Sequence, residues 1–109
     1  MRWVLGVGAA LLLACASPCP STCDQLYTED GCAIQRPGRN ETELVNACRE
    51  NCGEAWSTRG EVGDYDPYTQ VGAGESVTLE TRGQVDVWAE CIDETSCESL
   101  EDGFCAPVW

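Results

Sequence analysis

The sequence predicts a mainly α-helical, small disulfide-rich domain that is exported behind an N-terminal signal. An apolar segment at residues 1–14 contains a single charged residue, Arg2, near its start, as in secretory signals. The chain contains nine cysteines. Among the cysteines after Cys15, the pairs Cys19/Cys23 and Cys48/Cys52 have C-x3-C spacing, which places both thiols of a pair on one face of a helix. With 109 residues in all, the chain has room for one such domain.

The leader reads MRWVLGVGAALLLA, and its apolar run from Trp3 to Ala14 contains no charged residue. The run is too short to cross a bilayer as a helix, which requires about 20 apolar residues. We therefore assign residues 1–14 to a signal peptide, residues 15–18 to a tether and residues 19–109 to the disulfide-rich domain.

The end of the leader fits two processing routes. The segment Leu12-Leu13-Ala14-Cys15 resembles the bacterial lipobox, which implies lipidation of Cys15 and attachment to the membrane through that lipid. The segment Ala14-Cys15-Ala16 also fits the small-x-small rule of ordinary signal peptidase, which would release a chain starting at Ser17. Both routes remove Cys15 from the thiols that can form disulfides.

Removal of Cys15 leaves an even number of cysteines, which can close four disulfides. They make up about 8% of the mature chain, near the level of disulfide scaffolds. Four disulfides at about 2–4 kcal/mol each stabilise a domain by on the order of 10 kcal/mol, so we expect a structural role. Without histidine or a C-x-x-C motif, we expect no metal site and no thioredoxin-type redox centre. The predicted disulfide cysteines are Cys19, Cys23, Cys32, Cys48, Cys52, Cys91, Cys97 and Cys105.

The first helix is expected to begin around the first C-x3-C pair. Pro20 suits its first turn, where the missing N–H costs nothing, and the apolar residues after Cys23 extend the same face. We expect this helix to run to about Glu29 and to stop at Gly31, followed by a turn region at residues 30–40.

The second helix has a predicted N-cap at Asn40, and Glu43 can complete a capping box with it. Gly60 is expected to end this helix. Its apolar face is formed by Leu44, Val45, Cys48, Cys52, Ala55 and Trp56.

Residues 57–76 are polar and glycine-rich, and we expect a long loop there. Asp64 and Asp66 indicate a turn in this loop, because the spaced ligands and closing glutamate of a calcium loop are missing. After the loop, apolar residues recur at helical spacing and favour a helix from about residue 84 to 93. The alternative is a short β-hairpin over residues 77–87.

The C-terminal part is expected to contain one more helical turn. Ser96 can cap this turn, which would run through Leu100 and end at Gly103. The apolar tail at residues 104–109 is expected to pack back on the domain.

The two C-x3-C pairs predict part of the disulfide pattern. In an antiparallel helical hairpin the first cysteine of one pair faces the last cysteine of the other, and a slipped register would exchange the partners. The remaining four cysteines allow three pairings, and we favour the one that closes a compact loop around Gly103. The predicted pairs are Cys19–Cys52, Cys23–Cys48, Cys32–Cys91 and Cys97–Cys105.

Two resemblances follow from these motifs. The twin C-x3-C pairs within residues 19–52 resemble the helical hairpins of small mitochondrial import chaperones and coiled-coil-helix proteins. Together with the leader and the C-terminal Cys91-x5-Cys97 spacing, they resemble small cysteine-rich lipoproteins of myxobacteria, whose function is unassigned. The second resemblance covers most of the mature chain, although the loop at residues 57–76 departs from it. It implies a lipoprotein of the bacterial cell envelope, at the outer membrane, whereas the other cleavage implies an extracellular protein.

The residue types exclude several functions. The chain contains nineteen acidic residues and six arginines but no lysine or histidine, so its net charge is −13, or −14 without Arg2. Such a chain repels nucleic acid. It also lacks a histidine base and a lysine nucleophile, and we expect neither catalysis nor a cofactor. The acidic residues toward the C-terminus are expected to be solvated, namely Asp93, Glu94, Glu98, Glu101 and Asp102.

The remaining expectation is an envelope-anchored interaction or structural module. The membrane would be contacted through the lipid on Cys15, and a basic protein is the partner that the charge favours. The alternative is a freely secreted effector or inhibitor. If the contact with a partner is apolar, the candidate residues are Trp56, Trp88 and Trp109.

Overall fold

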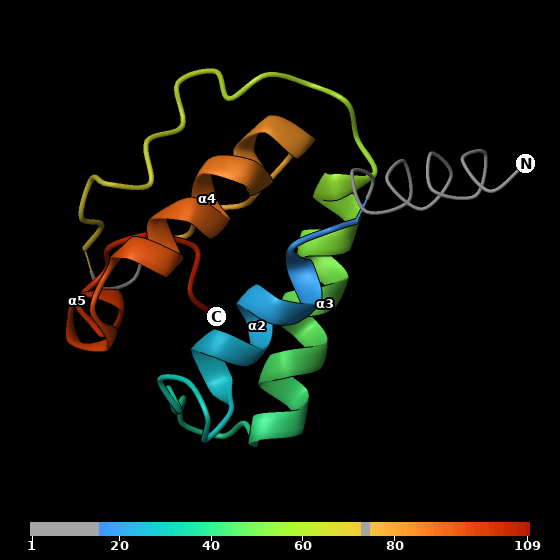
Figure 1. Cartoon of the computed structure of the whole chain (residues 1–109). Coiled ribbons are helices and arrows are strands. Elements are labelled where there is room, and N and C mark those ends of the chain that lie inside the picture. Colours follow the sequence, from blue (N-terminus) through green and yellow to red (C-terminus); the bar gives the residue numbers. More distant parts are fainter. Residues whose placement is uncertain (1–15, 73–74) are drawn as a thin grey trace, which may run out of the picture.

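The computed structural model describes residues 16–72 and 75–109. These residues form four helices and the loops that connect them. The helices are α2 (Cys19–Tyr27), α3 (Glu41–Trp56), α4 (Arg82–Glu94) and α5 (Cys97–Glu101), and α4 packs against both α2 and α3 (Figure 1). Within the described ranges there is no β-strand, only an isolated bridge between Arg36 and Arg39. The predicted mainly helical fold is therefore confirmed. The predicted signal peptide and the lipidation site at Cys15 lie outside the described residues.

Helix α2 is shorter at its C-terminal end than expected, since it ends at Tyr27 and not near Glu29. The main chain turns back on the helix at once, with the Cys32 N–H donating to Gln25 O and the Ile34 N–H donating to Leu26 O. Gly31 lies so close to the main chain of Gln25 that a side chain there would overlap it. This glycine therefore allows the close return of the chain.

Helix α3 begins with the predicted capping box. Asn40 Oδ1 accepts a hydrogen bond from the Glu43 N–H at 2.8 Å, and Glu43 Oε1 accepts one from the Asn40 N–H at 3.0 Å. The helix ends at Trp56, before Gly60, and the hydroxyl groups of Ser57 and Thr58 donate hydrogen bonds to the carbonyl oxygens of Gly53 and Glu54 in its last turn.

Two disulfides join α2 and α3 side by side in the antiparallel arrangement (Figure 1). Cys19 is bonded to Cys52 and Cys23 to Cys48, and the Cα atoms of each pair are 5.8 Å apart. These are the two pairs expected for an antiparallel hairpin in the unslipped register. All four cysteines are buried, so the disulfides form part of the hydrophobic core.

Residues 82–94 form helix α4, and the alternative β-hairpin over residues 77–87 is wrong. Thr81 is the N-cap, and its hydroxyl group accepts a hydrogen bond from the Gln84 N–H at 3.3 Å. A helix buries residues three or four positions apart, whereas a strand would have buried alternate ones. The fully buried residues of α4 follow the helical spacing and are Val85, Trp88, Cys91 and Ile92.

The other two disulfides differ from the predicted pairs. Cys32 is bonded to Cys97, and Cys91 is bonded to Cys105, in place of Cys32–Cys91 and Cys97–Cys105. Cys97 opens α5 on the exposed side of the domain, next to the loop that follows α2. The main chain then reverses after α5 and brings Cys105 back to the buried face of α4. A compact loop around Gly103 does not predict these two pairs, because the directions of α4 and α5 determine which cysteines lie close enough to form a disulfide.

The C-terminal tail packs on the domain, as predicted. The indole N–H of Trp88 donates to Pro107 O at 2.9 Å, and the rings of Trp88 and Trp109 meet edge to face at 5.9 Å between centroids. The hydroxyl groups of Tyr27 and Tyr65 donate to the main-chain oxygens of Trp109 and Ala106. These contacts fix residues 105–109 between the helices and the long loop.

Candidate functional site: a pocket beside Arg36

The acidic residues cover the outside of the domain. All nineteen lie in the described ranges, and every one is exposed except Asp24, which is half-buried. Asp24 Oδ1 forms an ion pair with Arg49 Nη2 at 2.8 Å. The five acidic residues between Asp93 and Asp102 are all among the exposed ones. Such solvated carboxylates keep a protein soluble and attract cationic partners.

One acidic residue near the end of α4 has a specific contact. The Tyr68 hydroxyl group donates to Glu94 Oε2 at 2.9 Å, and this hydrogen bond raises the pKa of Tyr68. Tyr68 is also a large side chain that is 50% exposed. Its aromatic ring therefore lies at the surface beside the carboxylates of α4.

The two aspartates of the long loop contribute to a turn. The Asp66 carboxylate accepts hydrogen bonds from the Tyr68 N–H at 3.0 Å and from the Thr69 hydroxyl group at 2.9 Å. Asp64 is exposed and has no hydrogen bond with Asp66 or its partners. Across residues 16–72 and 75–109, no three histidine, cysteine or acidic side chains are grouped in a way that could hold a metal ion.

The three tryptophans expected at an apolar contact have different positions. Trp88 is fully buried, so the expectation that it contacts a partner is wrong. Its place on the buried face of α4 explains this, because the helical spacing that predicted the helix also places this side chain in the core. Trp56 is half-buried under Arg82, whose guanidinium carbon lies 4.8 Å from the ring centroid. Trp109 is half-buried and lines a cavity.

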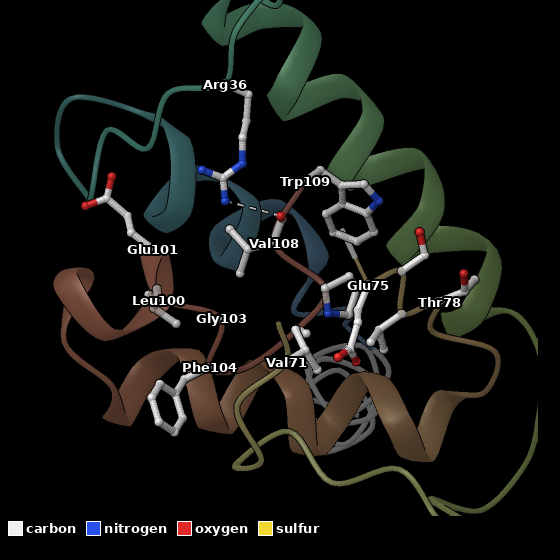
Figure 2. A pocket seen from close by; sticks show the side chains of 14 residues that line it. Arg36, Val71, Glu75, Thr78, Leu100, Glu101, Gly103, Phe104, Val108 and Trp109 are labelled. Atoms are coloured by element: carbon white, nitrogen blue, oxygen red, sulfur yellow. Dashed lines mark hydrogen bonds between the residues drawn. The ribbon is translucent and has the colours of Figure 1, made fainter. Parts of the chain in front are cut away.

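This cavity has a volume of about 350 Å³ and lies between the C-terminal tail, the end of the long loop and α5 (Figure 2). Tail residues form one side, residues 71 and 75–78 form another, and Arg36 reaches in from the loop between α2 and α3. The apolar residues that line it are Val71, Val77, Leu100, Phe104, Ala106, Pro107, Val108 and Trp109.

One wall of the cavity is fixed by contacts between the long loop and the end of α5. The Val71 N–H donates to Gly103 O at 3.0 Å, and the side-chain amide of Gln70 donates to Asp102 O at 2.7 Å. Gly103 has a φ of 105°, and a side chain at this position would overlap the main-chain oxygen of Val71. Glycine is therefore required for the loop to approach so closely.

Arg36 is the cationic group of the cavity. Its Nη1 donates to Gln35 O at 3.3 Å and its Nη2 donates to Val108 O at 3.4 Å, as the dashed line in Figure 2 shows for the second contact. Among the residues that the structure describes, no carboxylate lies within 4 Å of this guanidinium group. Arg36 is half-buried, while the side-chain carboxylates of Glu75 and Glu101, which line the cavity, are exposed.

The sequence did not single out Arg36. It stands in the segment Arg36-Pro37-Gly38-Arg39, which reads only as a turn. The cavity is built from three segments that are distant in sequence, so no local pattern could have indicated it.

No protein family, curated protein or solved structure matches this chain. In the described part of the chain, each helix is too short or too polar to cross a bilayer. The four disulfides indicate an oxidising compartment outside the cytoplasm.

Proposed function

We propose that this chain is a non-enzymatic binding module of the bacterial cell envelope, anchored through a lipid on Cys15. One observation carries the proposal. The eight cysteines after residue 15 pair completely with one another in four disulfides. The ninth cysteine, Cys15, stands outside these pairs in the sequence, at the lipobox-like end of the leader.

The chemistry of the side chains supports binding over catalysis. The sequence contains neither histidine nor lysine, the residue types that most often act as bases and amine nucleophiles. The acidic side chains are solvated and lack the buried surroundings that tune a carboxyl group for acid–base work. A rigid, cross-linked scaffold with a cavity and a charged surface suits recognition.

A short tether would hold the domain at the membrane surface. Three residues separate Cys15 from Cys19, the first residue of α2. Such a segment spans roughly 14 Å when fully extended. The start of α2 and the end of α3 would then face the bilayer, since Cys19 is bonded to Cys52. The Arg36–Arg39 turn would lie at the other end of this hairpin.

Free secretion is the second candidate, and the contact at Ser17 is compatible with it. Ser17 Oγ accepts a hydrogen bond from the Cys19 N–H at 3.1 Å, at the start of α2. Cleavage after Ala16 would keep this contact, so the released chain would retain the complete domain as an effector or inhibitor.

Metabolic labelling with a radioactive fatty acid tests the anchor. We expect the wild-type chain to incorporate label and to sediment with membranes, and Cys15→Ser to lose the label and become soluble. Ser17→Ala serves as the matched control, because it changes a neighbouring side chain and leaves the lipobox-like segment intact. An unlabelled wild-type chain that begins at Ser17 by mass spectrometry would show that the anchored function is wrong and that the chain is secreted.

A further inference from the structure

We propose that the cavity beside Arg36 binds the carboxylate of a small amphipathic anion, with an aliphatic or aromatic body in the apolar part. This inference rests on the proposed function as a binding module and names the ligand class for it. It does not depend on whether the module is anchored or secreted.

The guanidinium group of Arg36 provides the charged end of the site. Its two hydrogen bonds go to neutral carbonyl oxygens and use two of its five N–H donors. The protein has nineteen acidic side chains, yet in the described ranges none of their carboxylates lies within 4 Å of this half-buried guanidinium group. The planar fork of an arginine matches a carboxylate, and the hydrogen bonds are strengthened by both charges.

The tail and α5 provide the apolar part of the site. Val108 and Trp109 lie next to Arg36, and Leu100 and Val71 lie below Val108 in the view of Figure 2. A volume of about 350 Å³ is at the small end of the range for ligand pockets, roughly 300–1,000 Å³. The occupant that fits is therefore a small molecule with one polar end.

The two glutamates restrict the charge of the ligand. Glu75 and Glu101 line the same cavity and are exposed. Their carboxylates disfavour a second negative charge on the occupant, so a monocarboxylate fits better than a phosphate ester or a dicarboxylate. The net charge of −13 also repels any anion at long range, and salt screens this repulsion.

Salt dependence therefore separates this site from the acidic surface. A basic protein held by the acidic surface is released as the salt concentration rises. A monocarboxylate in the Arg36 cavity should bind equally well or better between about 20 mM and about 300 mM salt, because screening weakens the repulsion more than it weakens a short contact.

Titration calorimetry with octanoate tests the proposal. The exported, oxidised Cys15→Ser chain is suitable because it needs no detergent, which would compete with the probe. We expect octanoate to bind, octylamine to bind at least about tenfold more weakly, and Arg36→Gln to weaken octanoate binding by about tenfold or more. Arg59→Gln is the matched control, since it removes the same charge from an exposed position in the long loop.

Circular dichroism and the intact mass of the four-disulfide form establish that each variant is folded. Unchanged octanoate binding in folded Arg36→Gln, equal binding of octylamine, or no octanoate binding by the folded parent would each overturn the proposal. Fatty-acid labelling tests the anchor on Cys15, whereas titration calorimetry tests ligand binding in the cavity. A negative result for one proposal is therefore distinguishable from a negative result for the other.

Discussion

Two tyrosines connect the core to the C-terminal tail through hydroxyl groups that are shielded from water. Tyr27 donates to Trp109 O, and Tyr65 donates to Ala106 O. Burial raises the pKa of both side chains above the ordinary value of 10.0, and for Tyr27 the nearby Arg36 reduces the effect. A charged phenolate at either position would lose its solvation and the hydrogen bond that it donates.

These pKa shifts predict a loss of stability in alkali. Above pH 10 the unfolded chain releases the tyrosine protons while the folded chain keeps them, so the free energy of unfolding falls as the pH rises. Each tyrosine contributes a slope of up to about 1.4 kcal/mol per pH unit above its unfolded pKa. Urea unfolding at several pH values measures the slope, and Tyr65→Phe should make it shallower. An unchanged slope in this variant would show that Tyr65 is accessible to ionisation in the folded state.

At the scale of helices, the N-terminal cap of α3 is the feature for which sequence and structure agree in most detail. Asn40 and Glu43 exchange side-chain to main-chain hydrogen bonds, and Asn40 is exposed. The cap therefore contributes through hydrogen bonds alone and without packing.

Replacement of this cap should lower stability by a moderate amount. We expect Asn40→Ala to reduce the free energy of unfolding by about 1 kcal/mol, because the Glu43 N–H loses its acceptor. Urea denaturation of the oxidised protein measures the change. Asn46→Ala is the matched control, as an exposed asparagine within the same helix, and it should leave stability nearly unchanged or raise it slightly. Equal losses in the two variants would contradict the role of the cap.

Features encoded by neighbouring residues were predictable, and features created by chain reversal were not. The C-x3-C spacing is sufficient for Cys19–Cys52 and Cys23–Cys48 once two antiparallel helices are assumed. The pairs Cys32–Cys97 and Cys91–Cys105 depend on the direction of α5 relative to α4, which no local pattern specifies. The site also depends on tertiary packing and not on a local pattern. Arg36 lines the cavity only because the C-terminal tail packs beside the loop that follows α2.

At the scale of the whole molecule, the four disulfides differ in their access to solvent. Cys97 is exposed and Cys32 is half-buried, whereas the other six bonded cysteines are at most 4% exposed. Thiol exchange requires a thiolate to reach a disulfide sulfur. The bond between the loop after α2 and α5 is therefore the most accessible one.

Mild reduction should open the disulfides in a defined order. We expect a low concentration of thiol reductant to cleave Cys32–Cys97 first, so that brief alkylation and peptide mapping label these two cysteines before the others. Full labelling in denaturant is the control for the reactivity of all eight thiols. First labelling at Cys23 and Cys48 would contradict this order, because it would require the hairpin to open before the surface bond.

The position of Cys19 at the first residue of α2 also determines how the domain responds to mechanical force. If the domain is pulled between Cys15 and a bound partner, the force first acts on the domain at Cys19. The Cys19–Cys52 disulfide then transmits force directly to Cys52. The chain from residue 20 to residue 51, which contains most of α2 and α3, lies inside this covalent loop, and the Cys23–Cys48 and Cys32–Cys97 disulfides cross-link it further. A domain anchored at Cys15, as we propose, could therefore be loaded at its membrane end without its helical hairpin being drawn out.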